Sequence, residues 1–190
     1  MAKRVYFGFD YEDVSDFRAN VVRKHNFTSG VQKAGYFDAS MWEEAKKKDP
    51  ATLKRLINAE LENTSATAIL VGSGTWARRW VRYEIIKSIE RGNKVFGIHI
   101  NGIKGKDQLT KSLGADPFDY LALSVSQDGK SVTPMEYADG KWINFKDHGA
   151  FSIGQLAVAE RGKAFKLSHW LPVYDWAKGD GYNNFQTWIS

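Results

Sequence analysis

The chain has 190 residues, of which 43% are hydrophobic and 26% are charged, and it contains no cysteine. This length suits one well-buried core, and the composition excludes an intrinsically disordered chain. The lack of cysteine excludes disulfides, thiolate catalysis and zinc–sulfur sites. We therefore expect a single domain over residues 1–190, with core βα repeats over residues 1–100 and the last strand and helix elements, with an extension, over residues 101–190.

The net charge is +5, which suits an anionic partner such as a nucleotide. Nucleic acid is disfavoured, because the basic residues are spread along the chain and the densest run is only Lys46-Lys47-Lys48. No apolar run approaches the roughly 18 residues that a membrane span needs, and the sequence starts without an apolar signal segment. We expect a soluble, cytoplasmic protein with no membrane contact.

The first third of the chain predicts a strand, a helix, a short strand and a second helix. Residues 4–9 are rich in strand formers, and apolar residues then recur at helical spacing over 14–22, with Asp13 as the expected N-cap. A short strand is expected around residues 36–37. The Asp-Pro pair at 49–50 begins a helix that should end near residue 63.

The middle of the chain continues this alternation. Residues 66–71 form a near-continuous apolar run, typical of a strand buried on both faces. A Gly-rich turn at 72–75 leads into a helix expected over residues 75–91, and residues 95–100 give another buried strand. Strands that alternate with helices predict an α/β fold, with a doubly wound, mainly parallel sheet and right-handed crossovers.

After residue 100 the alternation is lost. A further strand is expected over residues 120–125, and residues 132–137 and 141–145 flank Asp139-Gly140, a strong hairpin signal. The extension should therefore contain a β-hairpin and a helix. Its aromatic residues are expected mainly in core and lid packing: Trp170, Tyr174, Trp176, Tyr182, Phe185 and Trp188.

In a doubly wound sheet, ligands bind outside the carboxyl ends of the strands, which directs attention to residues 9–13 and 72–76. Residues 72–77 fit a G-x-G-x-x-A pattern, but no acidic residue follows at the expected distance, so a tight turn is the favoured explanation. The alternative is that the exposed amides of this helix N-terminus hold a phosphate. Asp10, Glu12 and Asp13 weakly resemble a magnesium site. The four histidines lack metal-ligand spacing, so no metal is expected.

The helix over 75–91 carries the main candidate residue. On a helical wheel, Trp80 and Glu84 lie about 40° apart at one margin of the apolar stripe, so both should sit at the rim of the buried face. There a carboxylate is partly shielded and still able to meet a ligand. The alternative is a surface ion pair between Glu84 and Lys87, worth a few tenths of a kcal/mol. The stripe itself comprises Ala77, Val81, Ile85, Ser88 and Ile89.

Several segments together resemble the TIR domain, a flavodoxin-like module of innate immunity. They are Val5-Tyr6-Phe7-Gly8-Phe9 followed by Asp13, then Ala68-Ile69-Leu70-Val71-Gly72-Ser73, and Trp80-x-x-x-Glu84 after the third strand. In TIR proteins that cleave NAD, the glutamate of the W-x-x-x-E motif is catalytic, and it maps onto Glu84. Residues 37–44 depart from the R-D-x-x-P-G-like signature of adaptor-type TIR domains, which weakens an adaptor reading.

Further segments carry a closer resemblance, among them Phe37-Asp38-Ala39-Ser40-x-Trp42-Glu43, Gly97-Ile98-His99-Ile100-Asn101 and Pro117-Phe118-Asp119-Tyr120-Leu121. Through them, and over essentially its whole length, the chain resembles the TIR-like ThsB family of bacterial Thoeris anti-phage systems. That resemblance implies cleavage of NAD at the nicotinamide–ribose bond, cyclisation to a cyclic ADP-ribose isomer, and activation of a partner NAD-depleting effector, ThsA. It also implies a phage-derived trigger and a site completed by a neighbouring subunit. The resemblance implies NAD as the substrate, and no cofactor is expected. The alternatives are a non-catalytic interaction module and a simple NAD hydrolase.

Expected substrate contacts are Phe9, Asp10, Tyr11, Trp42, Ser73 and Trp80.

Overall fold

A four-stranded parallel sheet forms the centre of the molecule. The computed structural model describes residues 4–28 and 49–190, so the expected strand around 36–37 lies outside the described residues. The sheet has the order β1 (Val5–Phe9), β2 (Ala66–Val71), β3 (Lys94–His99), β8 (Val173–Asp175), and all three pairings are parallel. The α/β class and the mainly parallel sheet are confirmed.

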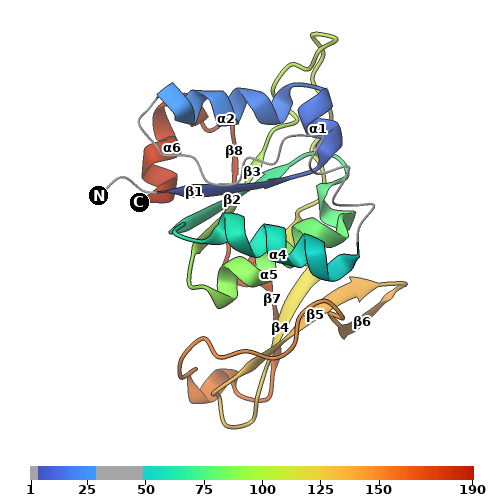
Figure 1. Cartoon of the computed structure of the whole chain (residues 1–190), viewed down its shortest axis with the longest axis vertical. Helices are drawn as coiled ribbons and strands as arrows, with labels where there is room; N and C mark the ends of the chain where they lie inside the picture. Colours follow the sequence, from blue (N-terminus) through green and yellow to red (C-terminus); the bar gives the residue numbers. More distant parts are fainter. Residues whose placement is uncertain (1–3, 29–48) are drawn as a thin grey trace.

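Helices cover both faces of this sheet (Figure 1). On one face lie α1 (Tyr11–Ser15), α2 (Arg18–Thr28) and the C-terminal α6 (Gly181–Ile189). On the other lie α4 (Pro50–Leu61) and α5 (Arg79–Glu90). The side chain of Asp49 caps α4 by accepting from the Ala51 and Thr52 amides, as the Asp-Pro pair predicted.

The strands divide their side chains between two cores, because successive residues of a strand point to opposite faces. Val5 and Phe7 of β1 pack in the cluster beneath α2 and α6. Tyr6, between them, packs in the cluster beneath α4 and α5. Gly8 follows Tyr6 at the next position on that second face. The face that carries α5 is therefore lined by Tyr6 and Gly8.

The C-terminal half builds a second, antiparallel sheet with the order β6 (Lys141–Asn144), β5 (Val132–Ala138), β4 (Leu121–Val125), β7 (Ala164–Lys166). It extends beyond α4 and α5 (Figure 1). Asp139 and Gly140 both have positive φ, 50° and 77°, as a tight β-hairpin turn requires. The expected hairpin and C-terminal helix are confirmed. Short 3₁₀ turns are η2 (Pro117–Tyr120), η3 (Val158–Glu160) and η4 (Leu167–His169).

The helix expected to begin at Asp13 is divided into α1 and α2. Phe17 lies between them with φ of 66° and is 51% exposed, so it ends the first helix instead of continuing the apolar stripe. Asp10 is the N-cap of α1, and its side chain accepts from the Glu12 amide. The assignment of Asp13 as N-cap was wrong, since Asp13 lies inside α1 and is buried.

The helix expected over 75–91 is also divided. A 3₁₀ turn, η1 (Thr75–Ala77), comes first, and Arg78 then adopts an extended conformation, with ψ of 115°, before α5 begins. Ala77 is consequently exposed and does not belong to the buried stripe, whereas Val81, Ile85 and Ser88 are buried as expected.

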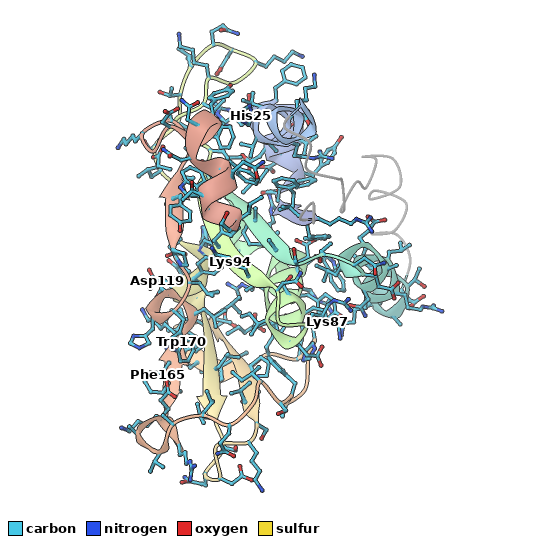
Figure 2. All side chains as sticks on the ribbon, turned by 90° about the vertical axis from the view of Figure 1, so that its left-hand side faces the viewer. His25, Lys87, Lys94, Asp119, Phe165 and Trp170 are labelled. Atoms are coloured by element: carbon cyan, nitrogen blue, oxygen red, sulfur yellow. The ribbon has the colours of Figure 1, made fainter. Side chains whose placement is uncertain are left out.

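The C-terminal aromatic residues have mixed environments. Trp176, Phe185 and Trp188 are buried in the core beneath α6, whereas Trp170 and Tyr182 are exposed. His25, labelled in Figure 2, meets the Tyr182 ring edge-on with the centroids 4.8 Å apart. Packing accounts for most of these residues but not for all. In the part of the chain that the structure describes, no helix is long and apolar enough to cross a membrane.

Candidate functional site

Glu84 lies inside the fold, beneath the first strand. It projects from α5 toward β1 and is only 4% exposed. The Tyr6 hydroxyl donates a hydrogen bond of 2.8 Å to Glu84 Oε1. Within residues 4–28 and 49–190, the second oxygen, Oε2, is buried and has no hydrogen-bond partner. A buried carboxyl oxygen without a partner is costly for a fold, and such groups concentrate at functional sites.

Gly8 makes room for this carboxyl. A Cβ atom at position 8 would lie 2.6 Å from Glu84 Oε2 and 2.7 Å from Ile69 Cδ1, closer than real Cβ atoms come. Gly8 is paired with Ile69 in the parallel ladder. Asp10 follows two residues later at the strand end, roughly 7 Å further along at about 3.3 Å per residue. The carboxyl therefore lies just short of the edge where this class of sheet binds ligands.

The environment favours the neutral form of Glu84. Burial raises the pKa of Glu84 from 4.5 to about 8, and the hydrogen bond from Tyr6 opposes that rise. Burial, with the neighbouring Glu84 next in importance, also raises the pKa of Tyr6. Near neutral pH the pair therefore consists of an uncharged carboxyl and an uncharged phenol.

The expected rim position of Glu84 was wrong, because α5 turns this side chain fully toward the sheet. The alternative ion pair is not formed either: Lys87 pairs with Glu90. Figure 2 labels Lys87 beside α5. The hydrogen bond that holds Glu84 comes from Tyr6, and Trp80, expected to support Glu84, packs instead against Tyr83 and beneath the Arg79 guanidinium.

A second group of polar residues gathers at the carboxyl edge of β1 and β2. Arg78 donates to Asp10 Oδ2 at 2.6 Å, which joins the start of α1 to the residue before α5. Asn101, after β3, donates to the Ser73 hydroxyl at 3.0 Å. The Thr75 hydroxyl accepts from the Gly72 amide, so this amide is engaged within the turn. Three strand ends therefore meet at one edge, as the fold class predicted.

Asp13 lies in the middle of this edge and is 4% exposed. Its carboxylate covers Gly72, where a Cβ would lie 2.0 Å from Asp13 Oδ2. Burial, followed by the charge of Asp10, raises the pKa of Asp13 to about 6, while Lys111 and Arg18 oppose the rise. Asp13 is thus a second carboxyl whose charge depends on its surroundings.

The other predicted substrate contacts lie in different places. Asp10 and Ser73 belong to the carboxyl edge. Phe9 packs against the core beneath α2, and the Arg23 guanidinium lies 4.8 Å from its ring centroid. Tyr11 begins α1 and is partly buried. Trp42 lies outside the described residues.

Sequence reasoning missed the residues that define the environment of Glu84. Tyr6 and Gly8 are separated from Glu84 by more than 75 positions, and only the strand alternation of β1 could have placed them on the α5 face. The arginines of α5 were left without a role. Arg79 forms a two-bond pair with Asp147, with both bonds at 2.6 Å, and Arg82 bonds Glu136 at 2.6 Å. They tie α5 to the C-terminal half.

The parallel sheet, the helices on both faces and the W-x-x-x-E glutamate directed at the first strand define a TIR-like α/β protein. A family model described as "Thoeris protein ThsB, TIR-like domain" matches residues 6–104, just over half of the chain. The chain is also 54% identical over 192 residues to a Bacillus cereus (strain MSX-D12) protein named "Putative cyclic ADP-D-ribose synthase ThsB1", with 100% of both chains covered. The chain therefore belongs to the Thoeris ThsB family of TIR-like proteins.

Proposed function

We propose that this protein cleaves NAD at the nicotinamide–ribose bond and closes the product into a cyclic ADP-ribose isomer. The observation that carries the proposal is the Glu84 carboxyl: it is buried, it has one free oxygen beside Gly8, and it lies just short of the strand edge. The name of the Bacillus cereus relative agrees with this activity. In an anti-phage system the cyclic product would activate a partner NAD-depleting effector, ThsA.

The chemistry needs one negative charge near the ribose. When the bond between ribose C1′ and the pyridinium nitrogen breaks, its electron pair goes to nicotinamide, which leaves uncharged, and the ribose becomes an oxocarbenium ion. A carboxylate beside C1′ stabilises that cation, as carboxylates do in glycosidases. Glu84 takes this role. A nearby substrate cation lowers the pKa of a carboxyl group, so bound NAD itself would favour the ionised form of Glu84.

Cyclisation sets a further requirement. A hydroxyl of the adenosine-side ribose must capture the oxocarbenium ion, with loss of its proton, before water does. The site must therefore hold the two ends of NAD together and exclude solvent. The polar edge formed by Asp10, Ser73 and Asn101 lies at the end of the strands that pack against Glu84, so it is suited to contact the ribose hydroxyls and the diphosphate. No metal and no strong general acid is needed, since the leaving group departs neutral.

The proposal is tested by identifying the products made from NAD by liquid chromatography and mass spectrometry. The assay is run with and without lysate from phage-infected cells, because Glu84 is covered in this structure and a trigger would have to uncover it. We expect nicotinamide and a cyclic ADP-ribose isomer, and we expect Glu84→Gln to abolish both. The matched control is Glu90→Gln on the same helix. Linear ADP-ribose alone would reduce the activity to hydrolysis.

A second candidate function is a non-catalytic interaction module. It is favoured by the burial of Glu84, because a neutral carboxyl that accepts from Tyr6 is also what a purely structural residue would look like. In that case NAD stays intact with the wild-type protein under both conditions. Glu84→Gln would then leave partner binding unchanged.

A further inference from the structure

Among the residues that the structure describes, Tyr6 is the one polar side chain with a hydrogen bond to Glu84. Its ring is 1% exposed and is fixed in the core beneath α4 and α5, and its backbone is held in register against Thr67 of β2. An immobile ring fixes the position of its hydroxyl oxygen, although the hydroxyl proton can still rotate. In this position the hydroxyl donates to Glu84 Oε1, at 2.8 Å.

We propose that Tyr6 is a positioning residue for this carboxyl: its hydroxyl holds Oε1 within the fold and leaves Oε2, beside Gly8, as the oxygen that meets the substrate. The inference rests on the proposed function, since it assigns a reactive oxygen. It adds a specific prediction, that orientation and ionisation of Glu84 depend on a residue of β1 that itself touches no substrate.

The charges around the pair leave Tyr6 without a competitor among the described residues. On α5, Arg82 bonds Glu136 and Lys87 pairs with Glu90. From α4, Lys54 pairs with Asp147, and Glu60 acts on Tyr6. On the strands, Thr67 of β2 bonds Ser88, and Lys94 of β3 bonds the Ser190 carbonyl. Apart from burial, the Tyr6 hydrogen bond is the influence that sets the ionisation of Glu84.

The test compares Tyr6→Phe with Tyr83→Phe. Tyr83 is a matched control because it is a buried tyrosine on α5 whose hydroxyl bonds Asn58, at 3.1 Å, and not Glu84. The first readout is the titration of carbon-13-labelled Glu84 by NMR, assigned with Glu84→Gln. The second is the dependence of kcat and KM for NAD on pH.

In Tyr6→Phe, the Glu84 midpoint should rise by about one pH unit, which leaves roughly tenfold less carboxylate near neutral pH. Accordingly, kcat/KM, which reports the free enzyme, should fall about tenfold near neutral pH and recover as the pH is raised. Tyr83→Phe should change neither the midpoint nor kcat/KM. A Tyr6→Phe protein that titrates and turns over like Tyr83→Phe would overturn the assignment.

The NMR titration keeps this inference separate from the proposed function, because it needs no turnover. If the wild-type protein never consumes NAD, the proposed function fails, and a raised midpoint in Tyr6→Phe still supports control of Glu84 by Tyr6. If Tyr6→Phe does not fold, 3,5-difluorotyrosine at position 6 replaces it. This stronger donor of nearly the same shape should lower the Glu84 midpoint, and an unchanged midpoint would overturn the proposal.

Discussion

Glu84 and Asp147 are two carboxyl groups of similar burial and opposite character. Glu84 is 4% exposed and Asp147 is 8% exposed. Glu84 lies on α5, and Asp147 contacts Arg79 of the same helix. Asp147 receives two hydrogen bonds from Arg79 and pairs with Lys54 at 3.2 Å. The hydrogen bonds from Arg79, more than any other influence, hold the pKa of Asp147 below its usual value, whereas burial raises the pKa of Glu84 to about 8.

The difference shows that burial alone does not decide the charge of a carboxyl group. Asp147 is stabilised as an anion by two cations, so it joins the two halves of the chain. Among the described residues, Glu84 has a hydrogen bond only from the Tyr6 phenol, and burial favours its uncharged form. Residues 78–85 therefore contain one face that anchors the helix to the C-terminal half, through Arg79 and Arg82, and another face, with Glu84, that is directed at β1.

The largest expected effect comes from filling the space beside Glu84. Gly8→Ala places a methyl group 2.6 Å from Oε2, so the carboxyl must move. A displacement of the carboxyl by about 1 Å is expected to lower NAD turnover about 10²-fold. Turnover is measured together with thermal unfolding.

Two further variants separate displacement of Glu84 from general damage to the core. Gly149→Ala is the control for a new methyl group, because nothing lies within 4 Å of that position. Combining Gly8→Ala with Ile69→Val relieves the other close contact and leaves the one with Glu84. Full turnover by a folded Gly8→Ala protein would show that the position of Oε2 does not matter.

The next effect concerns stability. Because the pKa of Glu84 is raised in the folded state, the folded protein holds a proton that the unfolded chain has lost, and wild-type stability falls as the pH rises from about 4.5 to 8. Glu84→Gln lacks this loss, so its stability relative to wild type should increase over that range, by on the order of 1 kcal/mol per pH unit at most. Urea unfolding at several pH values measures it. Parallel curves would mean that Glu84 is not held neutral.

A smaller effect of opposite sign is expected at Asp147. Its pKa is lowered on folding, so its contribution to stability is present above the unfolded pKa, near 3.9, and is lost as the pH falls through the folded value. Asp147→Asn should cost about 1–3 kcal/mol near neutral pH and little in acid. Exposed Glu62→Gln is the control in the same unfolding experiments. A loss that persisted at low pH would point to packing and not to charge.

The alternation of strands and helices up to residue 100 could be predicted because β2 and β3 are apolar runs with turn residues at both ends. The breaks at Phe17 and Arg78 could not, since neither residue is a helix breaker. Arg78 leaves the helical conformation where its guanidinium reaches Asp10, 68 positions earlier. Local sequence carries no trace of that partner.

The candidate site was predictable in its position and not in its environment. The fold class placed a crevice at the ends of β1 and β2, and the W-x-x-x-E spacing selected Glu84. A helical wheel placed Glu84 at the margin of the apolar stripe, because the wheel assumes that the helix packs on a flat surface. In the structure β1 lies directly over Glu84, where Gly8 has no side chain, so the carboxyl is buried. The Glu84 carboxyl can be buried at this depth because Gly8, on a strand distant in sequence, has no Cβ atom.

The most direct test of the account is the dependence of kcat/KM for NAD on pH, measured for wild type and Glu84→Gln between about pH 6 and 9. This quantity reports the pKa of essential groups in the free enzyme. We expect the wild-type value to rise with pH and level off above a midpoint near the Glu84 pKa of about 8, and we expect no turnover by Glu84→Gln. A flat wild-type profile, or wild-type turnover by folded Glu84→Gln, would contradict the account.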